Sequence, residues 1–245
     1  MIHNPRLGVL FVHIQKTAGT SITEAFRAER GSRLIKPHHM RLCDAVLPAE
    51  RPRIVAVVRN PWERQVSWYR MMVRKGVHNA LSAYLLAPEN GGADEGATEA
   101  CVRGDRLSGR KRPVSFSTFL RRTETIEETS TKELARSLRS RLWPIGPRPG
   151  APYLKSTGWN QEDYLLLDGQ FVGDDVLRFD RLEEAWAELG EALKPGEGWS
   201  RPLPRANSAP KPVDWRSYYG DDRDAEFVAT HYARDVARFG FTFDD

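Results

Sequence analysis

A short segment near the start of the chain combines residue types that bind anions. Residues 7–14 (LGVLFVHI) predict a buried strand, and residues 21–29 have the apolar spacing of a helix. Between them lies Lys16-Thr17-Ala18-Gly19-Thr20-Ser21. A helix N-terminus offers unpaired N–H groups, glycine allows close approach, and lysine and hydroxyls add charge and donors. We therefore predict a phosphate- or sulfate-binding turn, the alternative being a plain turn in which Thr20 or Ser21 only caps the helix.

A second candidate anion site follows the next apolar run. Residues 53–58 (RIVAVV) predict another buried strand, and Pro61 suits the first turn of the helix expected over residues 62–73. Arg59 leaves the strand and Ser67 lies one or two helical turns further on, so both side chains can reach one phosphate. The alternative is that Arg59 only pairs with a carboxylate such as Glu63.

The repeated order of strand, loop and helix predicts an α/β fold with a central, mostly parallel sheet flanked by helices. Ligands of such sheets bind beyond the carboxyl ends of the strands. Two anion sites at neighbouring strand ends suit one ligand with two separated anionic groups.

The first loop differs from the phosphate loop of kinases and ATPases. That motif has the pattern G-x-x-x-x-G-K-[ST], whereas here Lys16 precedes the single glycine, Gly19. The sequence also lacks a convincing acidic strand end of the type that holds magnesium. A phosphoryl-transferring enzyme is therefore disfavoured.

The remaining pattern predicts one domain over residues 1–245. Asp168-Gly169 indicates a hairpin turn between strands at 164–167 and 170–172. A mobile loop or lid is expected over residues 87–112. Further elements are expected as a strand at 176–179 and helices at 115–121, 131–142, 181–193 and 221–239.

Composition fits a folded protein without a membrane span. Of its 245 residues, 40% are hydrophobic and 29% charged, and no apolar run approaches the ~20 residues that a transmembrane helix needs. The net charge of +4 is too small and too evenly spread to indicate a nucleic-acid partner. Cys43 and Cys101 lack metal-ligand spacing. Together with the arginine-rich, lysine-poor usage, these features favour a cytoplasmic bacterial protein.

Two long segments resemble the sulfotransferases that use 3′-phosphoadenosine 5′-phosphosulfate (PAPS), in the branch related to heparan-sulfate O-sulfotransferases and small bacterial enzymes. They are FVHIQKTAGTS at residues 11–21 and VRNPWERQVSWY at 58–69. The stretches at 168–182, 203–208 and 232–241 are similar to later parts of the same family pattern. The chain departs from it at Gln15, where proline is usual, and at Asp180, where glutamate is usual.

The resemblance implies a P-loop-like three-layer fold and transfer of a sulfuryl group to an acceptor hydroxyl or amine, without a metal. It implies that Arg59 and Ser67 hold the 3′-phosphate of PAPS. A loop with Arg205 and Asn207 would close over the nucleotide. The residues implied for the 5′-phosphosulfate are Lys16, Thr17, Ala18, Gly19, Thr20 and Ser21, with Lys16 also stabilising charge on the leaving group.

An acceptor hydroxyl also needs a general base. His38 and His39 lie between the two motifs, and histidine titrates near neutrality. The family branch carries a histidine in this region, which favours His39; solvated loop histidines are the alternative, and Glu24 is a substitute base. His13 reads as a packed, hydrogen-bonded core residue.

The acceptor itself is not encoded in a motif. A small molecule or carbohydrate, a lipid and a peptide all fit, because the acceptor pocket would be built from loops such as 87–112 and 143–160. The oligomeric state has no sequence signal. Two other functions stay open, a non-catalytic nucleotide- or anion-binding module and a P-loop phosphotransferase.

Overall fold

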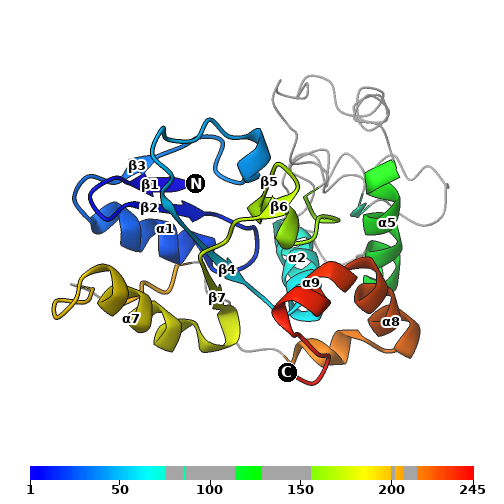
Figure 1. Ribbon diagram of the computed structural model, residues 1–245. Coiled ribbons are helices and arrows are strands. Elements are labelled where there is room, and N and C mark those ends of the chain that lie inside the picture. Colours follow the sequence, from blue (N-terminus) through cyan, green and yellow to red (C-terminus); the bar gives the residue numbers. More distant parts are fainter. Residues whose placement is uncertain (76–84, 87–113, 129–155, 200–201, 207–213) are drawn as a thin grey trace. The chain divides into compact units, whose positions relative to one another are not determined.

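The computed structural model describes residues 1–75, 85–86, 114–128, 156–199, 202–206 and 214–245 (Figure 1). The predicted loop at 87–112 and helix at 131–142 lie outside these residues. The chain forms two compact units. The first comprises residues 1–64, 160–214 and 234–245, and the second comprises 65–159 and 215–233. The expectation of one domain over residues 1–245 stays a prediction.

The first unit is built on a five-stranded mixed sheet in the order β3-β1-β2-β4-β7. Strand β2 pairs in parallel with β4, and β4 pairs in parallel with β7, whereas β1 runs antiparallel to both β2 and β3. The predicted α/β class with a mostly parallel central sheet is confirmed, and two strands are additions: β1, which runs antiparallel to its neighbours, and the edge strand β3. The strands are β1 (Ile2–Asn4), β2 (Val9–Val12), β3 (Arg33–Leu34), β4 (Arg53–Val58) and β7 (Asp175–Arg178).

The central strands are apolar throughout because both of their faces are buried. Alternate residues of β2 and β4 pack against the helices α1 (Gly19–Ala28) and α7 (Leu182–Leu193). Phe26 of α1 and Trp186 of α7 meet edge to face in this core, with ring centroids 5.4 Å apart. The intervening residues of both strands are also buried, as continuous apolar strands in parallel sheets require.

Parallel pairing brings the ends of three strands to one edge of the sheet. Val12 of β2 is in register with Ala56 of β4, and Val58 of β4 with Arg178 of β7. The segments that follow β2, β4 and β7 therefore leave the sheet side by side. The last of them continues into a 3₁₀ turn, Phe179–Arg181, that leads into α7.

Helix α2 (Pro61–Lys75) starts where the sequence predicts. The Oδ1 atom of Asn60 accepts hydrogen bonds from the backbone N–H groups of Trp62 (3.0 Å) and Glu63 (3.5 Å). Asn60 is thus the N-cap of α2, and Pro61 occupies the first turn, where its missing N–H costs nothing.

The hairpin at Asp168-Gly169 is confirmed. It joins β5 (Leu166–Leu167) to β6 (Gln170–Phe171), and both turn residues have positive φ, 49° and 75°. This is the conformation of a type I′ turn. The strands are shorter than predicted because residues Glu162–Leu165 form a 3₁₀ turn.

The expectation of one closing helix over 221–239 is wrong. The segment forms α8 (Asp222–His231) and α9 (Ala233–Phe239), separated at Tyr232, whose φ and ψ of −105° and 29° leave the helical range. The buried hydroxyl of Tyr232 donates to the carbonyl of Thr157 at 2.7 Å. Apolar spacing continues through the break, so the sequence pattern does not reveal it.

The second unit contains most of α2, helix α5 (Phe116–Glu128), α8 and a 3₁₀ turn at Trp215–Tyr218. Aromatic rings of Tyr69, Phe116 and Phe119 pack together there. A further 3₁₀ turn, Leu42–Asp44, lies in the first unit. Among the described residues, no helix has the length and apolarity needed to cross a membrane.

Candidate functional site

The loop between β2 and α1 has an unusual backbone. Lys16 and Ala18 both adopt left-handed conformations, with φ of 70° and 65°, although neither is glycine. Such conformations are uncommon outside glycine and occur often at ligand-binding sites. Alternating backbone conformations of this kind turn successive N–H groups toward one side, where they can bind an anion.

The start of α1 is not capped by a side chain. Ala18 is the N-cap residue, no side chain hydrogen-bonds as a cap, and the first turn has no acidic residue. Thr20 and Ser21 lie inside the helix, so the alternative in which either one only caps it is wrong. The helix N-terminus thus keeps the positive character that an anion requires.

Hydroxyl groups of the loop have different partners. The Oγ1 atom of Thr17 donates to the carbonyl of Ile14 at 3.0 Å and is fully buried, so this hydroxyl stabilises the loop. The Oγ atom of Ser21 accepts a hydrogen bond from the N–H of Ala206 at 3.1 Å. The segment before Asn207 therefore lies against the start of α1, as a loop over a ligand there would.

Arg59 connects the second motif to the first. One of its terminal nitrogens, Nη1, donates to the carbonyl of Lys16 at 3.2 Å, and the other, Nη2, donates to Glu63 at 2.7 Å. Its guanidinium also lies 4.1 Å from the ring centre of Phe179. The pairing with Glu63, which was the alternative to an anion site, is thus present, together with a contact to the first loop. The structure brings Lys16 and Arg59 to one place at the edge of the sheet.

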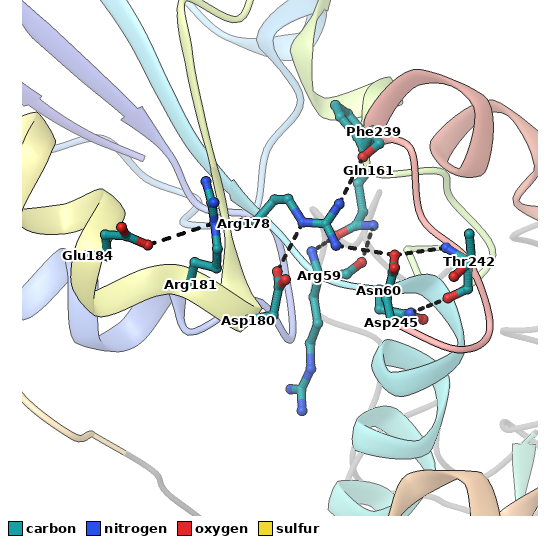
Figure 2. Close-up of polar contacts among 10 residues, drawn as sticks. All are labelled: Arg59, Asn60, Gln161, Arg178, Asp180, Arg181, Glu184, Phe239, Thr242 and Asp245. Carbon is teal, nitrogen blue, oxygen red and sulfur yellow. Dashed lines mark hydrogen bonds and ion pairs between the residues drawn. The ribbon is translucent and has the colours of Figure 1, made fainter.

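Polar contacts fix the strand ends around Arg59 (Figure 2). Arg178, the last residue of β7, donates to Asp180 at 3.1 Å and to Asp245 at 3.2 Å. Asn60 donates to the carbonyl of Thr242 at 2.7 Å. Figure 2 shows the guanidinium of Arg59 extending away from these residues, so the network holds its backbone and leaves its head group directed elsewhere.

Three other residues are predicted to bind PAPS, and the bonds described join neither Ser67 nor Arg205 to the two loops through a side chain. Ser67 is half-buried on α2 and belongs to the second unit. Arg205 is 81% exposed and pairs with Glu183 at 2.9 Å. Asn207 lies outside the described residues.

His39, and not His38, contacts the first motif. The Nδ1 atom of His39 lies 3.3 Å from the carbonyl oxygen of His13, and the two rings meet edge to face at 4.3 Å. Only a protonated nitrogen can bond to a carbonyl, so Nδ1 carries the hydrogen and the Nε2 of a neutral ring keeps a free electron pair. Burial lowers the pKa of His39 to about 4, which keeps the ring neutral at physiological pH.

The other two groups considered as bases differ from His39. Burial lowers the pKa of His38 as well, but its ring centre is 6.4 Å from that of His39 and it has no contact with the loop among the bonds described. Glu24 is exposed on α1.

His13 is a buried core residue, as the sequence predicts. Its Nδ1 atom lies 3.3 Å from Oγ1 of Thr23, and burial lowers its pKa to about 2. The position of its ring shows why residue 19 is glycine. A Cβ atom on Gly19 would lie 2.0 Å from Cδ2 of His13, well inside van der Waals contact.

Three residues near this site were not singled out from the sequence. Arg64 is fully buried and its Nε donates to the carbonyl of Gln15 at 3.1 Å. Gln161 hydrogen-bonds to the backbone of Arg59, and Asp235 hydrogen-bonds to Gln161. Arg64 falls within the second motif and Asp235 within the stretch at 232–241 that resembles the family pattern, and these were the only signals; Gln161 carries none.

No protein-family model, no curated protein and no solved structure matches this chain.

Proposed function

We propose that this chain is a sulfotransferase that transfers a sulfuryl group from PAPS to a hydroxyl or amine of a small-molecule or carbohydrate acceptor. In this proposal the sheet and its helices are a P-loop-like three-layer fold. The 5′-phosphosulfate of PAPS would bind at the loop from Lys16 to Ser21, and its 3′-phosphate would bind at Arg59.

The observation that carries the proposal is the contact between Arg59 and Lys16. Residues from two motifs, 43 positions apart, meet at neighbouring strand ends, with Nη1 of Arg59 3.2 Å from the carbonyl of Lys16. One motif ends in an uncapped helix N-terminus and the other in a guanidinium. This arrangement suits one ligand with two anionic groups, as in PAPS.

The reaction would be an in-line displacement at sulfur. The acceptor oxygen forms a new bond to sulfur while the bond from sulfur to the oxygen of the 5′-phosphate breaks. The acceptor proton passes to Nε2 of His39, and adenosine 3′,5′-bisphosphate leaves with the electron pair of the broken bond. Lys16 and the N–H groups of α1 would stabilise the negative charge on the leaving oxygen.

Hydrogen bonding and burial prepare His39 for this role. The carbonyl of His13 holds Nδ1–H, so that Nε2 is the free acceptor. A pKa of about 4 makes His39 a weak base in the free protein. A bound sulfated nucleotide would raise this pKa, because nearby negative charge favours the protonated ring.

The direct test is a transfer assay with ³⁵S-labelled PAPS against a panel of hydroxyl and amine acceptors. Labelled product from any acceptor supports the proposal, and fragmentation of the product in tandem mass spectrometry locates the sulfate on oxygen or nitrogen. Isothermal titration calorimetry with adenosine 3′,5′-bisphosphate and with magnesium–ATP separates the alternatives.

Each alternative function has its own outcome in these experiments. Tighter binding of magnesium–ATP would indicate a phosphotransferase and reject the proposal. Tight binding of the bisphosphate without transfer to any acceptor would indicate a non-catalytic binding module.

A further inference from the structure

Arg64 is a buried cation that contacts the first anion loop. Its side chain is fully buried on α2, and its Nε donates to the carbonyl of Gln15, the residue before Lys16. Since Arg59 donates to the carbonyl of Lys16, two arginines of the second motif hold two consecutive carbonyls of the first. A buried charge is costly unless it is paired and hydrogen-bonded, so its presence here needs a reason.

Asp235 is the buried anion associated with Arg64. It lies on α9, is fully buried, and accepts hydrogen bonds from the N–H of Gln161 (2.7 Å) and the N–H of Glu162 (2.9 Å). Burial raises its pKa to about 6, while the charge of Arg64 and these hydrogen bonds act in the opposite direction. The charge of Arg64 therefore interacts with a buried carboxyl group that is far away in the sequence.

Gln161 completes the connection back to the second loop. Its Oε1 accepts from the N–H of Arg59 and its Nε2 donates to the carbonyl of Arg59, both at 2.8 Å. The same Nε2 lies 3.1 Å from Asp235. One amide side chain thus satisfies both backbone groups of Arg59 and fixes the point where the chain leaves β4.

We call this set of residues the loop clamp: Gln15, Arg64, Asp235, Gln161, Arg59 and Lys16. Hydrogen bonds join Arg64 to Gln15, Asp235 to Gln161, Gln161 to Arg59 and Arg59 to Lys16, and the charge of Arg64 acts on the carboxyl of Asp235. All six residues belong to the first compact unit. A shift of one anion loop relative to the other would break a hydrogen bond of Arg59 or of Arg64.

We propose that Arg64, Asp235 and Gln161 are positioning residues that set the separation of the two anion loops, and thereby select ligands with two anionic groups over ligands with one. This inference rests on the proposed function, because it assumes that both loops bind the same nucleotide. When two sites bind two ends of one molecule, the gain in affinity depends on their spacing. Loss of a clamp contact should therefore weaken the binding of a ligand with two anionic groups more than the binding of a ligand with one.

The test compares adenosine 3′,5′-bisphosphate with adenosine 5′-monophosphate by calorimetry, for the wild-type protein and two variants. Arg64→Lys keeps a buried cation near Asp235 but removes the Nε donor and the planar guanidinium. Gln161→Met replaces the amide by an apolar side chain of similar size and so removes both hydrogen bonds to the backbone of Arg59. In both variants we expect the preference for the bisphosphate to fall on the order of 10- to 100-fold, the loss typical of small displacements within a site.

A matched control comes from the other end of the same strands. Arg53 at the start of β4 pairs with Asp175 at the start of β7. Arg53→Lys makes the same substitution at an arginine that does not contact either anion loop among the bonds described, and we expect it to leave the preference unchanged.

Hydrogen exchange of peptides covering residues 13–21 gives a readout that needs no nucleotide. We expect Arg64→Lys to accelerate exchange at these residues, with β4 unaffected. If Arg64→Lys changes neither the exchange rates nor the preference for the bisphosphate, this inference is wrong and the proposed function is untouched. If Arg64→Lys does not fold, the same two measurements on Gln161→Met decide the question. A wild-type protein without any preference for the bisphosphate would overturn both this inference and the proposed function.

Discussion

The ring of His13 occupies the space that a side chain on Gly19 would need, since a Cβ atom there would come within 2.0 Å of Cδ2 of His13. The histidine before the loop and the glycine within it are therefore a packed pair. Close packing of this kind makes the loop conformation sensitive to a single methyl group.

We expect Gly19→Ala to destabilise the protein by about 1–3 kcal/mol, as overpacking does, and to weaken nucleotide binding because the loop must shift. Thermal denaturation and calorimetry measure the two effects. Gly220→Ala is the matched control, because an added Cβ meets nothing within 4 Å there. Equal stability of the two variants would contradict the packing argument.

Lys16→Met should reduce the rate of transfer far more than it reduces nucleotide affinity. Loss of one donor aimed at developing charge costs roughly 10²- to 10³-fold in kcat in other enzymes. Steady-state kinetics with PAPS, together with calorimetry on adenosine 3′,5′-bisphosphate, separates the two quantities. A loss of affinity without a loss of kcat would assign Lys16 to binding alone.

Arg59→Gln should weaken the binding of adenosine 3′,5′-bisphosphate and leave the binding of adenosine 5′-monophosphate nearly unchanged, because only the first ligand carries a 3′-phosphate. Arg51→Gln is the control: Arg51 precedes the opposite end of β4 and forms an exposed ion pair with Asp174. Calorimetry with both nucleotides measures the difference. Equal weakening of both ligands would mean that Arg59 acts only through the loop conformation.

His39→Gln should lower kcat by about 10²- to 10⁴-fold, the contribution of a positioned base, while His38→Gln should have little effect. Because kcat/KM reports the free protein, its acid limb should lie near pH 4, the pKa to which burial lowers His39. A profile of kcat/KM against pH tests this. An acid limb near 6.5 would contradict the lowered pKa of His39, and a larger effect of His38→Gln would exclude His39 as the base.

Stability should fall as the pH drops from 7 to 4. The pKa values of His13 and His39 are lowered from 6.5 to about 2 and about 4, so the unfolded chain binds protons that the folded chain does not. Their contribution is complete above pH 6.5 and is lost below it. The pKa of Asp235 is raised from 3.8 to about 6, so this group acts in the opposite direction. Its contribution to stability is complete below pH 3.8 and is lost as the pH rises through 6. Because two histidines act against one carboxyl, the free energy of unfolding should fall by on the order of 1 kcal/mol for each pH unit.

Urea denaturation between pH 4 and 7 measures this dependence. The His13→Gln variant should show a shallower slope than the wild-type protein, since one of the two titrating histidines is removed. An unchanged slope would mean that His13 is not buried in its neutral form.

Local patterns predicted the elements that carry the two motifs. The strand at 53–58 has the predicted bounds, because a continuous apolar run with turn signals on both sides fits only a buried strand. The helix after Pro61 and the hairpin at Asp168-Gly169 were predictable because proline and glycine restrict the backbone at known positions. The association of the two motifs also followed, since parallel strands end at one edge.

The loop clamp could not be predicted. Gln161 lies outside every motif and Asp235 only within a stretch that resembles the family pattern, and their roles depend on contacts 74 positions apart along the chain. Arg64 resembles any helical arginine until its complete burial is known. The break between α8 and α9 was missed for the same reason: the buried hydroxyl of Tyr232 finds its partner at Thr157, far from it in sequence.

The clamp also has a consequence for synthesis of the chain. The two anion loops emerge during synthesis well before Asp235, the residue whose carboxyl interacts with the charge of Arg64, is made. Contacts between distant residues form late because closing a long loop costs entropy. A nascent chain would therefore carry both loops without their final spacing. A nucleotide would bind only to a chain that has folded through to α9, and its binding would stabilise that folded chain.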